Sequence, residues 1–243
     1  IGAQWGKLQL AEEIILLALE DDGGSFESLP DIQLHCAIIG ALLLELSLQG
    51  RIDADYQKLW VVNSTPTGDV ILDELLAQLV LHSPIYLRQF MSQLLNHAVD
   101  YQSRLLQRLC DAGFDVSLET SGALDVSKVD PRVSKVLDLK TPTSGEEHRN
   151  LISNLDYLTS HDQIKFVICN REDYEWSKQQ VEQYQLQTKV STVWFSPAFA
   201  VEKGAVALPA LARDLAQWIL EDHLPVRFQL QLHKLLWNDE SGR

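Results

Sequence analysis

The chain has 243 residues, 46% of them hydrophobic, and a formal net charge of -14 at pH 7. This length and apolar content are enough for the core of one large domain or of two modest ones. The acidic excess is greater before residue 105 than after it. It opposes binding to nucleic-acid phosphates and to anionic lipid surfaces, because both need clustered positive charge. We therefore expect no nucleic-acid partner and no membrane binding, while neutral partners and metal-bridged anions stay open.

The cysteines and the apolar runs indicate the cellular compartment. Cys36, Cys110 and Cys169 lie far apart, and an odd, sparse set of cysteines is no disulfide framework. This favours a reducing compartment. No apolar run reaches the roughly 18 to 20 residues that span a bilayer, and the chain does not open on a basic-then-apolar signal segment. We expect a soluble, cytoplasmic protein.

The first hundred residues are predicted to be mostly helical, because apolar residues recur there at helical spacing. Five helices are expected, over residues 8–19, 31–48 and 70–79, from Pro84 onward, and over residues 101–112. Weak alternation over residues 51–62 predicts a hairpin, and residues 65–69 form a turn before the third helix. This order is that of a winged helix. Its DNA-binding interpretation fails, because this part is net negative and no helix carries a stripe of Arg or Lys.

Three segments in this part carry a family resemblance. They are Leu-Ala-Glu-Glu-Ile-Ile-Leu-Leu-Ala-Leu at residues 10–19, Gly-Ala-Leu-Leu-Leu-Glu-Leu-Ser-Leu-Gln-Gly-Arg-Ile at 40–52, and Thr-Pro-Thr-Gly-Asp with Leu-Asp-Glu-Leu-Leu at 65–69 and 72–76. Together they resemble the Golgi-phosphoprotein family, bacterial members included. The resemblance implies a helical domain over residues 1–104 and, in eukaryotic members, phosphoinositide binding through a Trp and several Arg. Those residues are not evident here, because Ile38 and Ile39 stand where a basic residue is needed and no Trp lies between Phe26 and Leu44. The alternative is that these helices form only a core.

Beyond residue 105, short apolar strands alternate with helices of about a dozen residues. Strands are expected over residues 116–118, 133–139, 164–169, 190–195 and 226–232, and helices over 146–158, 173–184 and 208–221. This alternation is typical of βαβ units in a parallel sheet. We therefore predict the α/β class, with right-handed crossovers that place helices outside the sheet.

Polar residues follow four of these strands. They are Glu119, Thr120 and Ser121, then Asp138 and Lys140, then Ser196 before Pro197, and last His233 and Lys234. Since parallel strands end at the same edge, these side chains would line one rim and suit a cofactor with ribose, carboxylate and amine groups. Each set also has a plain structural interpretation. Thr120 and Ser121 can simply form a turn, Asp138 can pair with Lys140, and His233 can be hydrogen-bonded beneath a helix.

A second resemblance covers nearly all of residues 105–243. It is carried by the helix at 105–114, Leu-Glu-Thr-Ser-Gly at 118–122, Val-Leu-Asp-Leu-Lys-Thr-Pro at 136–142, His-Asp-Gln-Ile-Lys-Phe-Val-Ile-Cys at 161–169 and Arg-Phe-Gln-Leu-Gln-Leu-His-Lys at 227–234. These segments resemble the carboxyl-terminal part of the 7-carboxy-7-deazaguanine synthase family, radical S-adenosylmethionine enzymes of queuosine biosynthesis.

The resemblance implies ring contraction of 6-carboxy-tetrahydropterin with a 4Fe-4S cluster, S-adenosylmethionine and Mg²⁺ inside a partial β/α barrel. It also implies a role for ten residues. The S-adenosylmethionine site would be lined by Glu119, Thr120, Ser121, Asp138, Leu139, Lys140, Phe195, Ser196 and Pro197, and His233 would contact the carboxylate of the pterin substrate.

The chain departs from this family where the cluster should be held. A radical enzyme needs three closely spaced thiolates, the C-x3-C-x2-C run, and neither that run nor the family's Gly-Gly-Glu-Pro segment occurs in this sequence. We therefore expect no cluster or metal ligands and no synthase activity from this chain alone. A barrel without its early strands also leaves an open strand edge at residues 116–118. We expect the amino-terminal helices or a second copy, in a homo-oligomer, to cover it.

Overall fold

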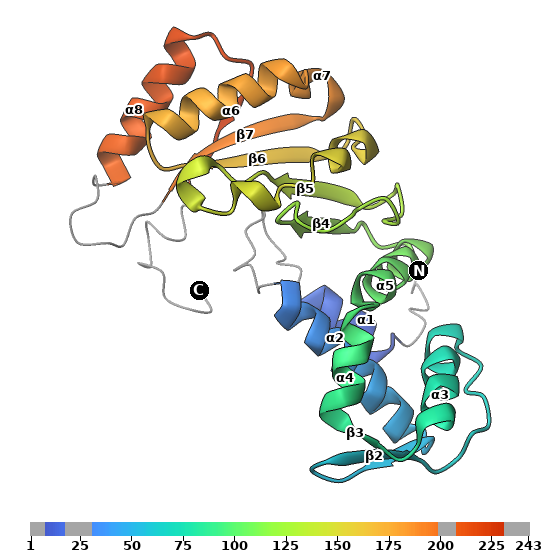
Figure 1. Cartoon of the computed structure of the whole chain (residues 1–243). Helices are drawn as coiled ribbons and strands as arrows, with labels where there is room; N and C mark the ends of the chain where they lie inside the picture. The colour runs from blue at the N-terminus through green and yellow to red at the C-terminus, as the bar shows by residue number, and fades with distance from the viewer. Residues whose placement is uncertain (1–7, 18–30, 199–207, 231–243) are drawn as a thin grey trace. The chain divides into compact units, whose positions relative to one another are not determined.

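The computed structural model describes residues 8–17, 31–198 and 208–230. The chain forms two compact units, which we call the first unit (Ile1–Val116 with Lys128–Val133) and the second unit (Ser117–Ser127 with Ser134–Arg243). Figure 1 shows the elements of each. The domain boundary predicted after residue 104 stays a prediction. Helix α5 (Ala98–Asp111) runs without a break through that position.

The first unit contains five helices and a small sheet within its described residues. The helices are α1 (Leu10–Leu17), α2 (Asp31–Leu48), α3 (Val70–His82), α4 (Leu87–Leu95) and α5. The antiparallel sheet has the order β1 (Ile52–Ala54), β2 (Lys58–Val61) and β3 (Ile85–Tyr86). The third strand was not foreseen. Pro84 was expected in the first turn of a helix, which is wrong, because the backbone of Ile85 pairs with Leu59 and the helix begins only at Leu87.

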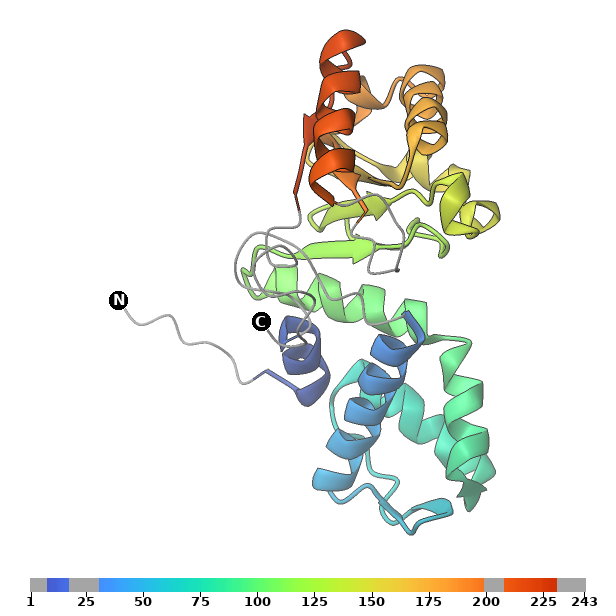
Figure 2. The same cartoon turned by 90° about the vertical axis from the view of Figure 1, so that its left-hand side faces the viewer.

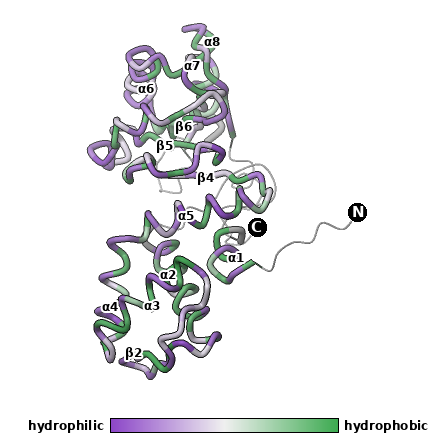
Figure 3. The backbone as a smooth tube through the Cα atoms, turned by 90° about the vertical axis from the view of Figure 1, so that its right-hand side faces the viewer, coloured by the Kyte–Doolittle hydropathy of each residue, from purple (hydrophilic) through white to green (hydrophobic). Residues whose placement is uncertain are grey.

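Helix α2 is the centre of the first unit's core. Ile38, Ile39, Leu42 and Leu46 are fully buried on it, and α1, α3, α4 and α5 all contact it. A helix that is apolar nearly all round is stable only when it is enclosed on most sides. Figure 3 shows this hydrophobic colouring along α2.

The second unit is built on a parallel sheet, which confirms the predicted α/β class. Its five strands have the order β4 (Ser117–Thr120), β5 (Ser134–Asp138), β6 (Gln163–Ile168), β7 (Thr192–Pro197) and β8 (Arg227–Phe228). The helices are α6 (Arg171–Gln183), α7 (Leu186–Lys189) and α8 (Leu208–Glu221). Figures 1 and 2 show α6 and α8 on one face of this sheet. Of the strand predicted over residues 226–232, the last two residues lie outside the described part.

The face of the sheet beneath α6 and α8 is the core of the second unit, and we call it the core face. Leu137, Ile164, Phe166 and Phe195 are fully buried there, and the rings of Phe166 and Phe195 meet edge to face at 5.4 Å. Since successive strand residues point to opposite faces, their neighbours in sequence lie on the other side, which we call the second face.

The connection between β5 and β6 is not the helix predicted over residues 146–158. It forms three short 3-10 turns, η1 (Pro142–Ser144), η2 (Glu147–Arg149) and η3 (Ile152–Tyr157). Ile152, Leu155 and Leu158 pack on the core at a spacing of three, which matches three residues per turn rather than 3.6. Asparagines in this stretch also bond to distant backbone groups, and such bonding competes with an α-helix.

Candidate functional site

Three of the four predicted polar segments lie at one edge of the sheet. β4, β5 and β7 are parallel and end at Thr120, Asp138 and Pro197. The structure therefore brings these strand ends to the same rim, which we call the carboxyl edge and define as residues 119–121, 138–140 and 195–197. The fourth predicted segment, with His233, lies outside the described residues.

The predicted site residues divide between the two faces of the sheet. Leu139 and Phe195 are buried in the core face, so their side chains do not reach the second face. Asp138 and Ser196 alternate with them and lie on the second face. The chemistry of the site therefore depends on the side chains of the second face.

Two acceptors at the carboxyl edge are buried without a hydrogen-bond partner. Asp138 Oδ2 accepts a bond of 2.7 Å from Lys140 Nζ, but Asp138 Oδ1 has no partner among the described residues. Ser196 is fully buried, and within the described ranges its Oγ is likewise unpaired. Buried polar groups are nearly always hydrogen-bonded in folded proteins. Of the five such side-chain atoms among the described residues, two lie at this edge, which makes it a candidate place for a polar ligand that supplies hydrogen-bond donors.

Sequence reasoning missed a set of polar side chains on the second face of the central strands. Lys165 on β6 is only 8% exposed, and its Nζ lies 3.7 Å from Glu119 Oε1. Next to it, Trp194 Nε1 donates to Gln163 Oε1 at 2.6 Å, and the Arg227 guanidinium lies 5.8 Å from the Trp194 ring centroid. The sequence signal for these side chains was the alternation in β6, where polar Gln163 and Lys165 alternate with the buried Ile164 and Phe166.

This face mixes charges of both signs with an aromatic ring. Glu119 and Asp138 supply negative charge, and Lys140 and Lys165 supply positive charge. Such a surface suits a zwitterionic ligand with a flat ring better than a simple anion, because each ligand charge finds an opposite partner.

Two of the predicted segments also make the purely structural contacts that the sequence allowed, a turn at Thr120 and Ser121 and an ion pair between Asp138 and Lys140. Thr120 Oγ1 accepts a bond of 3.3 Å from the Gly122 amide, so this stretch does form a turn. Gly122 has φ of +73°, and a Cβ there would lie 3.3 Å from Leu137 Cδ1, so the turn requires glycine. Asp138 and Lys140 do pair with each other. These contacts leave Asp138 Oδ1 and Ser196 Oγ unexplained.

The described residues do not fit a 4Fe-4S cluster. Among the described residues, no three His, Cys, Asp or Glu side chains form a group that could hold a metal ion. Burial raises the pKa of the Cys169 thiol to about 11, with Asp173 contributing, and burial also raises the pKa of Cys110. A cluster ligand must instead be a thiolate, which a lowered pKa favours.

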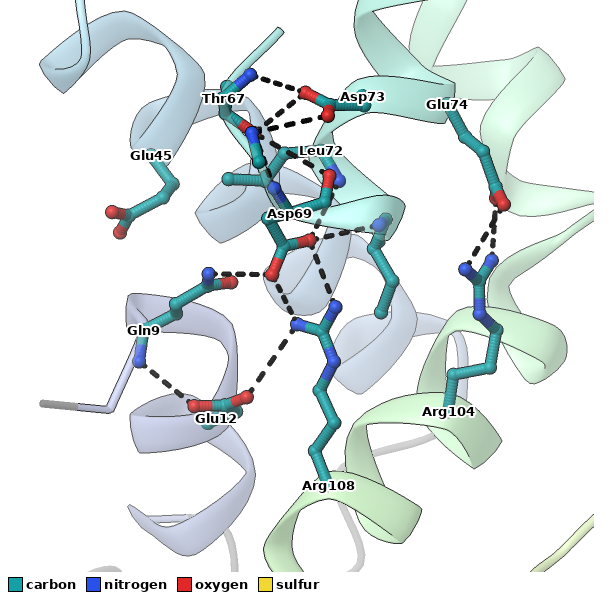
Figure 4. Close-up of polar contacts among 12 residues, drawn as sticks. Gln9, Glu12, Glu45, Thr67, Asp69, Leu72, Asp73, Glu74, Arg104 and Arg108 are labelled. Carbon is teal, nitrogen blue, oxygen red and sulfur yellow. Dashed lines mark hydrogen bonds and ion pairs between the residues drawn. The ribbon is translucent and has the colours of Figure 1, made fainter. Parts of the chain in front are cut away.

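In the first unit, the Thr-Pro-Thr-Gly-Asp turn belongs to a polar cluster centred on Asp69 (Figure 4). Asp69 caps α3 by accepting bonds from the amides of Ile71 and Leu72, at 2.9 and 3.1 Å. It also accepts from Gln9 Nε2 at 2.8 Å and pairs with both terminal nitrogens of Arg108, at 2.8 and 3.0 Å. This motif therefore ties α1, α3 and α5 together.

The Asp69 carboxylate is held in its charged form. Burial raises its pKa, but hydrogen bonds from Arg108, the Leu72 amide and Gln9 outweigh burial, so the pKa lies below its ordinary value. Arg104, one turn before Arg108 on α5, makes a two-pronged pair with Glu74 at 2.6 and 3.1 Å. Both of these α5 arginines are thus engaged by acids.

Comparison with known proteins finds two kinds of relative for this chain. The family model described as Golgi phosphoprotein 3 (GPP34) matches residues 10–114. The 7-carboxy-7-deazaguanine synthase of Koribacter versatilis is 44% identical over 140 residues, 56% of this chain and 62% of the relative. That of Chlorobaculum tepidum is 38% identical over 140 residues, 56% of this chain and 60% of the relative.

The chain carries both resemblances. The synthase of Methanospirillum hungatei is a further relative, 30% identical over 138 residues that cover 56% of this chain and 53% of the relative. The chain thus spans 53 to 62% of the length of these curated relatives. No helix in the described part of the chain has the length and apolar character that crossing a bilayer requires.

Proposed function

We propose that residues 105–243 bind S-adenosylmethionine as the carboxyl-terminal part of a 7-carboxy-7-deazaguanine synthase-like partial β/α barrel. A Golgi-phosphoprotein-like helical domain would occupy residues 1–104, and the protein would be cytoplasmic. The similarity to the synthases over 140 residues supports this. So does the parallel sheet, whose order β4-β5-β6-β7-β8 follows the chain as successive βαβ units of a barrel would.

The observation that carries the proposal is the pair of unpaired acceptors at the carboxyl edge. Asp138 Oδ1 and Ser196 Oγ are buried without partners within the described residues, and each lone pair would accept from a ribose hydroxyl or an ammonium group. Leaving such groups unpaired costs about 1 to 3 kcal/mol each. A ligand that pairs them recovers this free energy, so the edge favours a molecule with several donors.

Under this proposal the chain alone does not complete the radical reaction. When bound, a 4Fe-4S cluster supplies the electron that cleaves S-adenosylmethionine, and the cysteines at 36, 110 and 169 form no C-x3-C-x2-C run. From the resemblance to the synthases, we also propose that the substrate is a pterin, that His233 contacts it and that the reaction needs Mg²⁺. We therefore propose a binding domain that is inactive by itself.

Binding is tested by titrating the whole chain with S-adenosylmethionine in a calorimeter. Asp138→Asn and Ser196→Ala should each weaken binding about tenfold, because the first replaces one acceptor oxygen with an NH2 donor and the second removes the hydroxyl. Ser191→Ala is the matched control. Its Oγ bonds to the Asp162 carbonyl at the other end of the same strand, so its affinity should equal that of the unaltered chain. The proposal fails if the unaltered chain shows no binding.

Inactivity is tested by anaerobic reconstitution with iron and sulfide, followed by assay with 6-carboxy-tetrahydropterin. We expect no bound cluster and no product. More than about two irons per chain, together with turnover, would show that thiolate ligands do come together.

A second candidate function belongs to the first unit and rests on the family match over residues 10–114. In this alternative, the unit binds a phosphoinositide head group at a membrane surface. The pairing of Arg104 and Arg108 with acids counts against it. Sedimentation with vesicles of phosphatidylcholine and a phosphatidylinositol phosphate tests it. Binding that weakens with added salt supports it, and no binding removes it.

We also propose a homo-oligomer. In the described part of the second unit, β4 is an end strand that pairs only with β5, and an open strand edge invites pairing with another chain. Size-exclusion chromatography with light scattering decides this, and a monomer at all concentrations would reject it.

A further inference from the structure

We propose that Asn150 and Asn154 are positioning residues that fix two loops of the carboxyl edge in their binding conformation. The inference rests on the proposed S-adenosylmethionine site. It concerns residues that lie outside the predicted set, in the connection between β5 and β6. That connection was expected to be a helix and instead forms the turns η2 and η3.

Asn150 holds the backbone of Lys140 from both sides. Its Oδ1 accepts from the Lys140 amide at 2.9 Å, and its Nδ2 donates to the Lys140 carbonyl at 2.9 Å. Lys140 lies beyond the last residue of β5, where the sheet no longer fixes the backbone. The Lys140 ammonium in turn binds Asp138 Oδ2 at 2.7 Å. Asn150 therefore sets the position from which Lys140 engages Asp138.

Asn154 performs the same task for the loop that follows β4. The side chain is fully buried, and its Oδ1 accepts from the Val126 amide at 3.1 Å. Its Nδ2 donates to the carbonyls of Gly122 and Leu124, at 3.2 and 2.8 Å. One amide group thus spans the loop directly after Thr120 and Ser121. The Leu151 amide adds a further bond of 2.9 Å to the Gly122 carbonyl.

Together the two asparagines hold the backbone just beyond the ends of two neighbouring strands, β4 and β5. One short segment carries both, so the loop after β4 and the end of β5 are tied to the same support. Holding side chains in a ready geometry reduces the ordering cost of binding. We therefore expect the asparagines to act on the affinity of the edge for its ligand as well as on the stability of the fold.

The test compares Asn150→Ala with Tyr174→Phe in the whole chain. Tyr174 Oη donates to Asp222 Oδ2 at 2.7 Å, so its loss removes a partly buried hydrogen bond of the second unit that touches neither loop. Two quantities are measured for each variant: amide hydrogen-exchange protection at Lys140 and at residues 122–126, and the dissociation constant for S-adenosylmethionine. Asn154→Ala extends the comparison if it folds.

Asn150→Ala should lower protection at the Lys140 amide and weaken binding, each about tenfold, because the bonds to the Lys140 amide and to its carbonyl are both lost. Tyr174→Phe should change neither, although both variants lower the unfolding midpoint. Unchanged protection at Lys140, or equal loss of affinity in the two variants, overturns the inference. If the unaltered chain binds no S-adenosylmethionine, the proposed function fails, and the exchange data alone then decide whether Asn150 fixes the edge.

Discussion

The polar cluster around Asp69 in the first unit and the carboxyl edge in the second unit both place acids among buried groups, but they differ in pairing. Asp69 accepts from two amides, from Gln9 and from Arg108. Asp138 accepts from Lys140 through one oxygen, while its other oxygen is unpaired within the described residues. The first arrangement joins three helices, and the second leaves binding capacity at a sheet edge.

Paired acids contribute to the stability of the fold, whereas unpaired acceptors are available for binding a ligand. A buried carboxylate with every lone pair engaged lowers the free energy of the folded state. An unpaired acceptor raises it, and proteins retain such groups where a function needs them. The second unit also contains a buried acid whose oxygens are paired, as those of Asp69 are; we call such acids the paired class. Asp162, fully buried at the amino end of β6, accepts from the Lys135 and Thr159 amides at 2.7 Å each and pairs with Lys135 Nζ at 3.2 Å.

The largest expected effect is that of Asp162→Ala. It would leave the Lys135 ammonium, only 2% exposed, without this ion-pair partner, and breaking a buried pair from one side costs about 3 to 5 kcal/mol. Urea denaturation followed by circular dichroism measures the free energy of unfolding. Ser191→Ala, which loses one bond to the Asp162 carbonyl, is the control and should cost about 1 kcal/mol. Equal costs in the two variants would contradict the assignment of Asp162 to the paired class.

Asp69→Ala should come second, at about 2 kcal/mol, because it removes a helix cap together with the partner of Arg108. The effect should depend on pH. The pKa of Asp69 is lowered in the folded protein, so its contribution is present above the ordinary carboxyl range and is lost as pH falls through the folded pKa, below about pH 4. Denaturation of the variant and the unaltered chain at several pH values measures this. The difference in free energy of unfolding between the two proteins should become smaller in acid. If it does not, the charge on Asp69 is not the cause of the stabilisation.

Arg104→Ala should have a small effect, under about 1 kcal/mol, because its pair with Glu74 is largely at the surface. Arg108→Ala is the matched comparison one turn along α5 and should cost more, because Asp69 is more buried than Glu74. Thermal unfolding of both variants checks the order. The reverse order would show that exposure does not set the strength of these pairs.

Ser196→Ala should cost no stability and should raise the free energy of unfolding by about 1 kcal/mol, because the hydroxyl it removes is buried without a partner among the described residues. The same variant should bind S-adenosylmethionine about tenfold more weakly. A clear loss of stability would place Ser196 with Asp69 in the paired class and remove it from the proposed site.

Much of the architecture followed from periodicity. The apolar run in α2 predicted a central helix, and the strands after residue 105 predicted a parallel sheet whose ends share a rim. The contribution of Lys165 and Trp194 was missed, because it depends on which strands are neighbours. The turns around Asn150 were predicted as a helix, since local spacing does not record bonds to residues ten or more positions away.

The sequence by itself determined the α/β class, the two family resemblances and the strand ends where polar residues gather. Those features depend on local order along the chain, on spacing and on residue type. Only the tertiary structure decided that Leu139 and Phe195 enter the core while Asp138 and Ser196 face the other side, and that two acceptors there are left unpaired. A hydrogen bond needs two groups within about 3 Å, and packing between distant segments, rather than their order in the chain, brings such groups together.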